Sequence, residues 1–203
     1  MSAAVTDPDA PATSEGTGRR KRHTILWVAV ALGAVIALFV AVLATRHPAA
    51  NQVVPTPLAG KAAPDIDGQT IVSPNGAGGR FRLSDQQGKF TLVNFFATWC
   101  GPCHQEHPEL VKFARDHASQ GDAQVVSVVY GDTAKAVRQF FVENGGNWPV
   151  VDDPGDRTSL DYGVRGVPES FLISPSGTVL LRITGGVTAD GLNSLINQAE
   201  GNK

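Results

Sequence analysis

The sequence has 203 residues, of which 42% are hydrophobic and 18% are charged, so it can form one ordinary globular domain with appendages but hardly two. Its formal net charge of -2 argues against nucleic acid as a partner, because nucleic-acid-binding surfaces are usually strongly basic. The chain has only two cysteines, Cys100 and Cys103. No framework of several disulfides can therefore hold the fold, and the pair is suspected of chemistry.

The first 57 residues are expected to lie outside the folded domain. Residues 1–23 have almost no large apolar side chains and predict a disordered cytoplasmic tail. Residues 24–45 carry no charge and follow a basic cluster, which predicts one N-terminal transmembrane helix that anchors the chain. A cleaved signal peptide is the nearest alternative, but its apolar region would span only about 7 to 15 residues. Residues 46–57 contain several prolines and predict a linker.

By the positive-inside rule, the N-terminus is cytoplasmic and everything after the anchor lies outside the plasma membrane. Residues 58–203 then form a single extracytoplasmic domain in which strands and helices alternate. The predicted order is a buried strand, a helix, a strand, a helix, a hairpin and a closing helix, at 89–97, 100–119, 125–130, 133–143, 171–183 and about 192–199. This order predicts an α/β sandwich around a mixed sheet.

The two cysteines lie in the run Trp99-Cys100-Gly101-Pro102-Cys103, at the start of the first helix of this domain. Side chains at positions i and i+3 of a helix have β-carbons about 5 to 6 Å apart, near enough for a disulfide. The helix N-terminus stabilises a thiolate, so Cys100 is the expected nucleophile. Cys103, one turn inside and more buried, is expected to attack the mixed disulfide and release the substrate.

Two segments carry a resemblance to a known family. The run 93–103, VNFFATWCGPC, with Glu106, Pro108 and Leu110 after it, resembles the thioredoxin superfamily, and more narrowly its membrane-tethered TlpA, ResA and CcmG (DsbE) group. The run 163–173, GVRGVPESFLI, resembles the segment that carries the cis-proline of that fold. The resemblance covers about residue 58 to the C-terminus and implies a thioredoxin-like three-layer sandwich with a central mixed β-sheet.

The resemblance also implies roles for individual residues. The Val167-Pro168 bond would be cis and would lie against the cysteine pair, where the backbone of Val167 could pair with an extended substrate segment. Trp99 would shield the edge of the thiols. Gly101 and Pro102, between the cysteines, belong to the same substrate-contacting surface.

One position departs from thioredoxin, which has a buried aspartate on the strand before the cysteines. The matching residue here is Asn94, which cannot act as a base. Glu169, directly after the predicted cis bond, is the first candidate for the vacant acid/base role. Glu106, one turn beyond Cys103, is the second.

Other readings of the cysteine motif are weaker. Cys100 to His104 also fits the C-x-x-C-H signature of covalent haem attachment, but the only methionine is Met1, so a methionine ligand is excluded. Zinc binding by the two cysteines with His104 and His107 is disfavoured because two pairs within about one helical turn surround a metal poorly. The two histidines are expected to be exposed. No metal and no dissociable cofactor are predicted.

We therefore expect an extracytoplasmic thiol-disulfide oxidoreductase whose substrates are proteins that contain disulfides or dithiols. The resemblance to the ResA and CcmG proteins implies reduction of apocytochrome c for cytochrome c maturation, with electrons from a membrane donor of the CcdA or DsbD type. The Gly-Pro pair favours a reductant, since thioredoxin has a potential near about −270 mV and the oxidant DsbA one near about −120 mV. A DsbE-like oxidant of secreted proteins is the alternative, and a non-enzymatic haem-binding or scaffold module is a remote one.

Overall fold

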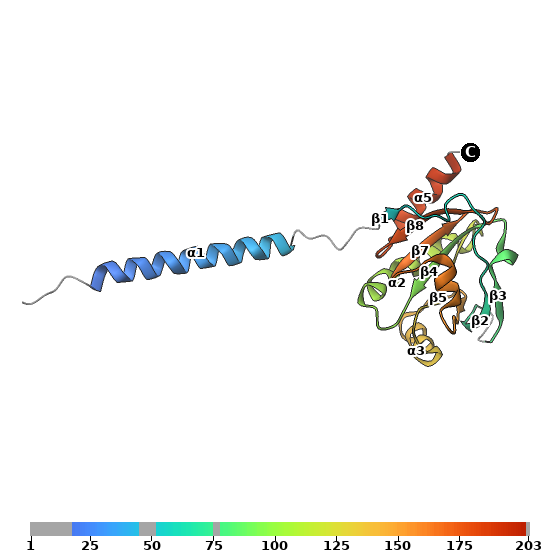
Figure 1. Ribbon diagram of the computed structural model, residues 1–203, viewed down its shortest axis with the longest axis horizontal. Coiled ribbons are helices and arrows are strands. Elements are labelled where there is room, and N and C mark those ends of the chain that lie inside the picture. Colours follow the sequence, from blue (N-terminus) through green and yellow to red (C-terminus); the bar gives the residue numbers. More distant parts are fainter. Residues whose placement is uncertain (1–17, 45–51, 75–77, 202–203) are drawn as a thin grey trace, which may run out of the picture. The chain divides into compact units, whose positions relative to one another are not determined.

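The computed structural model describes residues 18–44, 52–74 and 78–201 (Figure 1). The chain divides into two compact units, 1–48 and 49–203. In the first unit, helix α1 (Gly18–Ala44) begins inside the predicted tail and includes most of the predicted anchor. Its side chains from 26 to 41 are exposed. Among the described residues, no helix is long and apolar enough to cross a membrane. The rest of the predicted tail lies outside the described residues.

The second unit is built on a mixed sheet, as predicted. Its described strands have the order β1-β8-β7-β4-β5-β6-β2-β3. The bounds are β1 (Gln52–Val54), β2 (Asp67–Val72), β3 (Arg80–Arg82), β4 (Phe90–Phe96), β5 (Ala123–Val129), β6 (Val150–Val151), β7 (Glu169–Ile173) and β8 (Val179–Thr184). Strands β4, β5 and β6 are parallel, and the remaining pairings are antiparallel.

Five helical segments connect or follow these strands: η1 (Leu83–Gln86), α2 (Gly101–Ala118), α3 (Ala134–Asn144), α4 (Arg157–Tyr162) and α5 (Ala189–Gly201). The predicted elements from residue 89 onward are confirmed. The sequence did not predict η1, α4 or the strands β1, β2, β3 and β6. The predicted linker therefore needs correction, because β1 lies within it and pairs with β8, with Val53 opposite Ile183.

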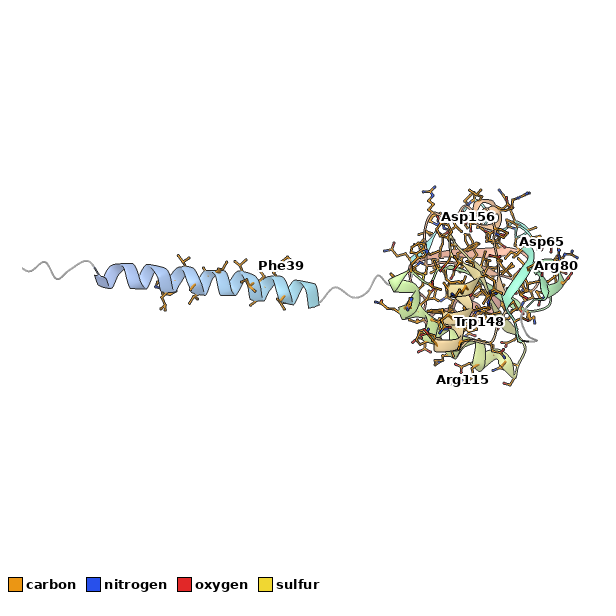
Figure 2. The ribbon with its side chains drawn as sticks, turned by 90° about the horizontal axis from the view of Figure 1, so that it is seen from below. Phe39, Asp65, Arg80, Arg115, Trp148 and Asp156 are labelled. Atoms are coloured by element: carbon orange, nitrogen blue, oxygen red, sulfur yellow. A yellow bond between two sulfur atoms is a disulfide. The ribbon has the colours of Figure 1, made fainter. Side chains whose placement is uncertain are left out.

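Strand β4 explains the two-sided core. Every residue of this strand is buried, and successive side chains point to opposite faces of the sheet. Leu92 and Phe96 join one cluster, to which α2, α3 and α5 contribute, and Trp148, labelled in Figure 2, belongs to it. Val93 and Phe95 join a second cluster, which contains Phe81, Leu83 and Tyr162. Helical or irregular segments thus cover both faces of the sheet, in three layers.

Candidate active site

The cysteine pair lies where β4 ends and α2 begins. Cys100 is the N-cap of α2, and a disulfide joins it to Cys103 with a Cα–Cα distance of 5.3 Å, which confirms that the two thiols can pair. The backbone N–H of Cys103 donates to Sγ of Cys100 at 3.2 Å. This contact is what a helix N-terminus offers to a thiolate once the disulfide is reduced. Cys100 and Cys103 are 4% and 3% exposed, so burial does not distinguish them in the disulfide form.

The two residues before Cys100 are held by the loop after β5. The carboxylate of Asp132 accepts hydrogen bonds from the backbone N–H of Thr98 at 2.7 Å and from its hydroxyl at 2.6 Å. The indole N–H of Trp99 donates to the carbonyl of Gly131 at 3.1 Å. The Trp99 side chain is 62% exposed. These contacts fix the segment that leads into Cys100 while leaving a large aromatic surface open to a partner.

The cis peptide expected before Pro168 is present, between Val167 and Pro168. Pro168 is buried, and its carbonyl accepts from the N–H of Gly185 at 3.1 Å. Val167 is half-buried and packs against both core clusters, the first of which contains the two cysteines. Two segments far apart in the sequence therefore contribute to one core region.

Asn94 and Glu106 form a buried polar contact between β4 and α2. The Asn94 side-chain amide donates to Oε1 of Glu106 at 2.8 Å, and the backbone N–H of Val187 donates to Oε2 at 3.0 Å. Glu106 is only 3% exposed. Burial raises the pKa of its carboxyl to about 7, although both hydrogen bonds act in the opposite direction. Glu106 lies three residues after Cys103, so both side chains lie on one helical face.

Glu169 lies in a different environment. It is 2% exposed, and its Oε1 lies 2.6 Å from Nε of Arg182. The Nη2 group of Arg182 donates to Oε2 at 2.9 Å. Removal of this carboxylate would leave the guanidinium of Arg182, whose side chain is 12% exposed, without its partner, which is costly. The acid/base role of Glu169 and of Glu106 stays a prediction.

The predicted exposure is confirmed for His104 and is wrong for His107. His104 is exposed, and its Nε2 lies 2.7 Å from the carbonyl oxygen of Thr98. His107 is only 5% exposed, because its ring packs among Phe140, Phe141 and Trp148. Its Nε2 contacts the carbonyl of Gly145 at 2.9 Å, and burial lowers its pKa. In the described part of the chain, no group of three or more His, Cys, Asp or Glu side chains could hold a metal ion.

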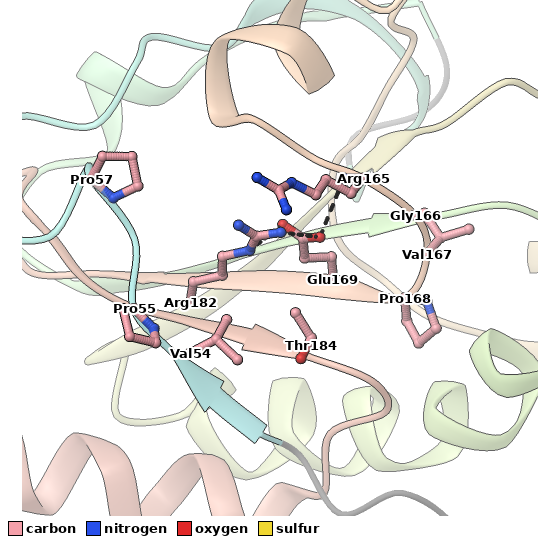
Figure 3. A pocket seen from close by; sticks show the side chains of 10 residues that line it. All are labelled: Val54, Pro55, Pro57, Arg165, Gly166, Val167, Pro168, Glu169, Arg182 and Thr184. Atoms are coloured by element: carbon pink, nitrogen blue, oxygen red, sulfur yellow. Dashed lines mark hydrogen bonds and ion pairs between the residues drawn. The ribbon is translucent and has the colours of Figure 1, made fainter.

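A pocket of about 590 Å³ opens beside the cis-proline (Figure 3). Its lining comes from three places: the segment that contains β1, the loop before β7, and the paired strands β7 and β8. The residues are Val54, Pro55, Pro57, Arg165, Gly166, Val167, Pro168, Glu169, Arg182 and Thr184. A substrate segment that meets Val167 and Pro168 would lie at this pocket.

Sequence reasoning missed Asp132 and Arg182. Asp132 follows β5 closely, as Thr98 follows β4, and the carboxyl ends of parallel neighbours meet at one edge of a sheet. That signal could have suggested the contact. Arg182 had no comparable signal, because its pairing with Glu169 depends on the register of β7 against β8.

Comparisons with known proteins agree with this geometry. The family model described as Redoxin matches residues 58–196. The thiol:disulfide interchange protein HelX of Rhodobacter capsulatus is 38% identical over 145 residues, which cover 70% of this chain and 77% of the relative. The thiol-disulfide oxidoreductase ResA of Bacillus subtilis is 38% identical over 132 residues, 64% of this chain and 73% of the relative.

Solved structures are similar as well. A structure described as a thiol:disulfide interchange protein DsbE from Chlorobium tepidum matches with a TM-score of 0.60 and 31% identity, over 70% of this chain and 96% of that chain. A second protein from Chlorobium tepidum, described as a thioredoxin family protein, has a TM-score of 0.59 and 28% identity, over 72% of this chain and 99% of that chain. The fold is therefore thioredoxin-like.

Proposed function

This chain belongs to the Redoxin family and is a thiol-disulfide oxidoreductase, and we propose that it reduces disulfides in extracytoplasmic proteins, apocytochrome c among them. The observation that carries the proposal is the Cys100–Cys103 disulfide at the N-terminus of α2, in a core region to which Val167 of the cis-proline segment also contributes. A dithiol held at a helix N-terminus can give two electrons to a substrate disulfide without any cofactor.

The reaction is two successive thiol-disulfide exchanges. The thiolate of Cys100 attacks one sulfur of the substrate disulfide, whose S–S bond breaks, and the other substrate sulfur leaves as a thiolate that takes up a proton. Cys103 then loses its proton and attacks Sγ of Cys100, which releases the second substrate thiol. The substrate gains two electrons and two protons, and the protein ends in the disulfide form that the structure describes.

Glu106 is the proposed proton acceptor for Cys103. Its pKa of about 7 gives comparable amounts of acid and base near neutral pH, which suits proton transfer. It lies on the same helical face as Cys103, and Asn94 occupies the position of the thioredoxin aspartate while orienting the Glu106 carboxyl through its amide. The Asn94 amide and the Glu106 carboxyl of α2 would thus take the place of the buried aspartate of thioredoxin.

The proposed location is outside the plasma membrane, with the chain anchored near its N-terminus. The support comes from the sequence, in which the uncharged run 24–45 follows Arg19 to Arg22. A membrane donor of the CcdA or DsbD type, carrying a dithiol, would return two electrons to the Cys100–Cys103 disulfide. Extraction of membranes at alkaline pH tests the anchor: an integral protein stays in the pellet, and release into the supernatant would contradict it.

A redox titration of the full-length protein tests the direction of electron flow. The Cys100–Cys103 couple is equilibrated with dithiothreitol and glutathione buffers, and the Cys100→Ser variant serves as the blank. A potential well below about −200 mV supports the reductant, whereas a value near about −130 mV would support an oxidant of secreted proteins. Reduction of an oxidised apocytochrome c peptide by the pre-reduced protein then tests the substrate.

A further inference from the structure

The pocket beside the cis-proline contains three charged side chains, and two of them neutralise each other. Glu169 and Arg182 form the ion pair described above, with side-chain exposures of only 3% and 12%. The guanidinium of Arg182 also lies 5.9 Å from the centre of the Phe171 ring. This pair is built into the sheet, since Glu169 lies on β7 and Arg182 on β8. It adds no net charge to the pocket.

Arg165 supplies the remaining charge. It lies in the loop between α4 and β7, and its side chain extends toward the Glu169–Arg182 pair in Figure 3. Its backbone N–H donates to Oε2 of Glu169 at 3.5 Å. Arg165 is exposed, and no carboxylate of the described residues forms an ion pair with its guanidinium. The pocket therefore has an excess of one positive charge.

The other walls of the pocket offer mainly apolar contact. Val54, Pro55, Pro57, Val167 and Pro168 line it, and none of their side chains can donate or accept a hydrogen bond. An extended segment that enters can gain apolar contact from these walls. Its charge preference must then come from Arg165, because the charges of Glu169 and Arg182 are already paired with each other.

We propose that Arg165 makes this pocket selective for substrate segments that carry an acidic side chain close to the disulfide to be reduced. The inference rests on the proposed function and names the class of substrate for the same site. A glutamate or aspartate carboxylate would form a charge-assisted hydrogen bond with the Arg165 guanidinium, while the neighbouring residues of the segment contact the proline walls. A basic residue at that position would be repelled.

The test compares peptide substrates that differ only in charge. Each peptide has one intramolecular disulfide between two cysteines, with Glu, Gln or Lys at the flanking positions. The full-length protein is pre-reduced, and its oxidation by each peptide is followed in single turnovers. We expect the Glu peptide to react about tenfold faster than the Lys peptide at low ionic strength, with the Gln peptide between them. The preference should shrink as salt is added.

Charge variants assign the preference to one residue. Arg165→Gln should abolish the difference in reaction rate among the three peptides, and Arg165→Glu should make the Lys peptide react fastest and the Glu peptide slowest. Arg138→Glu is the matched control, because Arg138 is exposed on α3 and does not line the pocket, and it should keep the wild-type order. Thermal unfolding checks that each variant is folded.

Two different results would contradict these proposals. If the Gln peptide is reduced but charge makes no difference, or if Arg165→Glu keeps the wild-type order, the charge selectivity is refuted and the reductase proposal stands. If no peptide oxidises the pre-reduced protein, the proposed function itself fails, and the selectivity fails with it.

Discussion

The buried carboxyl of Glu106 gives the sharpest prediction, through the substitution Glu106→Gln. The two side chains have nearly the same shape, but glutamine cannot ionise. Its amide oxygen can still accept from the N–H of Val187, which donates to Oε2 at 3.0 Å in the present structure. Any pH dependence that differs between the two proteins therefore comes from the ionisation of Glu106.

The size and sign of the effect follow from the pKa. Burial raises the pKa of Glu106 from 4.5 to about 7, so the folded state holds the proton over a pH range in which the unfolded state has lost it. The proton therefore stabilises the fold fully below about pH 4.5, and this contribution is lost as the pH rises through about 7. A shift of this size corresponds to about 3 kcal/mol in the free energy of unfolding.

Urea unfolding at pH values from about 4 to about 8 measures this contribution, with the disulfide kept oxidised. The stability of Glu106→Gln relative to wild type should rise by about 3 kcal/mol across that range. Glu109→Gln is the matched control, since Glu109 lies on the same helix and is less buried. A difference between Glu106→Gln and wild type that does not change with pH would refute a buried carboxyl that titrates near 7.

Three further predictions concern neighbouring groups. Cys103→Ser should accumulate a mixed disulfide between Cys100 and substrate, seen as a mass increase that dithiothreitol removes, because the releasing thiol is gone; a variant with normal turnover would contradict the assignment. Glu169→Gln should lower the free energy of unfolding by about 3 kcal/mol, since it leaves Arg182 buried without its carboxylate, and an unchanged urea midpoint would argue against that pair. Asp132→Ala removes the acceptor that fixes the segment before Cys100 and should slow reaction with protein substrates more than with dithiothreitol; equal slowing would oppose a role in presenting the site.

The central part of the fold could be predicted because its signals are local. Strand β4 is a continuous apolar run, and α2, α3 and α5 repeat apolar residues at helical spacing. Three of the four missed strands are different. Strands β1 and β3 have three residues each, and β6 has two, which is too short for an alternating pattern. They exist because a neighbouring strand offers hydrogen-bonding partners, and a sequence pattern does not reveal such partners.

In the active site, too, the features with local sequence signals could be predicted and the others could not. The cysteines and Pro168 could be found because each belongs to a contiguous motif with its own chemistry. The environments of Glu106 and His107 could not, since both depend on segments far along the chain. Val187 approaches the carboxyl of Glu106 from 81 positions away, and Gly145 approaches the ring of His107 from 38 positions away.

The two buried glutamates differ in a way that position relative to the cis-proline does not reveal. Both Glu106 and Glu169 are almost fully buried, so burial alone would not separate them. The difference lies in their partners: Glu169 faces a guanidinium at 2.6 Å, whereas Glu106 faces the neutral amide of Asn94 and a backbone N–H. A neutral partner is compatible with both the charged and the protonated form of the Glu106 carboxyl. Proton transfer needs both forms, and this requirement supports the proposal that Glu106 takes the proton from Cys103, while Glu169 pairs with Arg182 in the wall of the pocket beside the cis-proline.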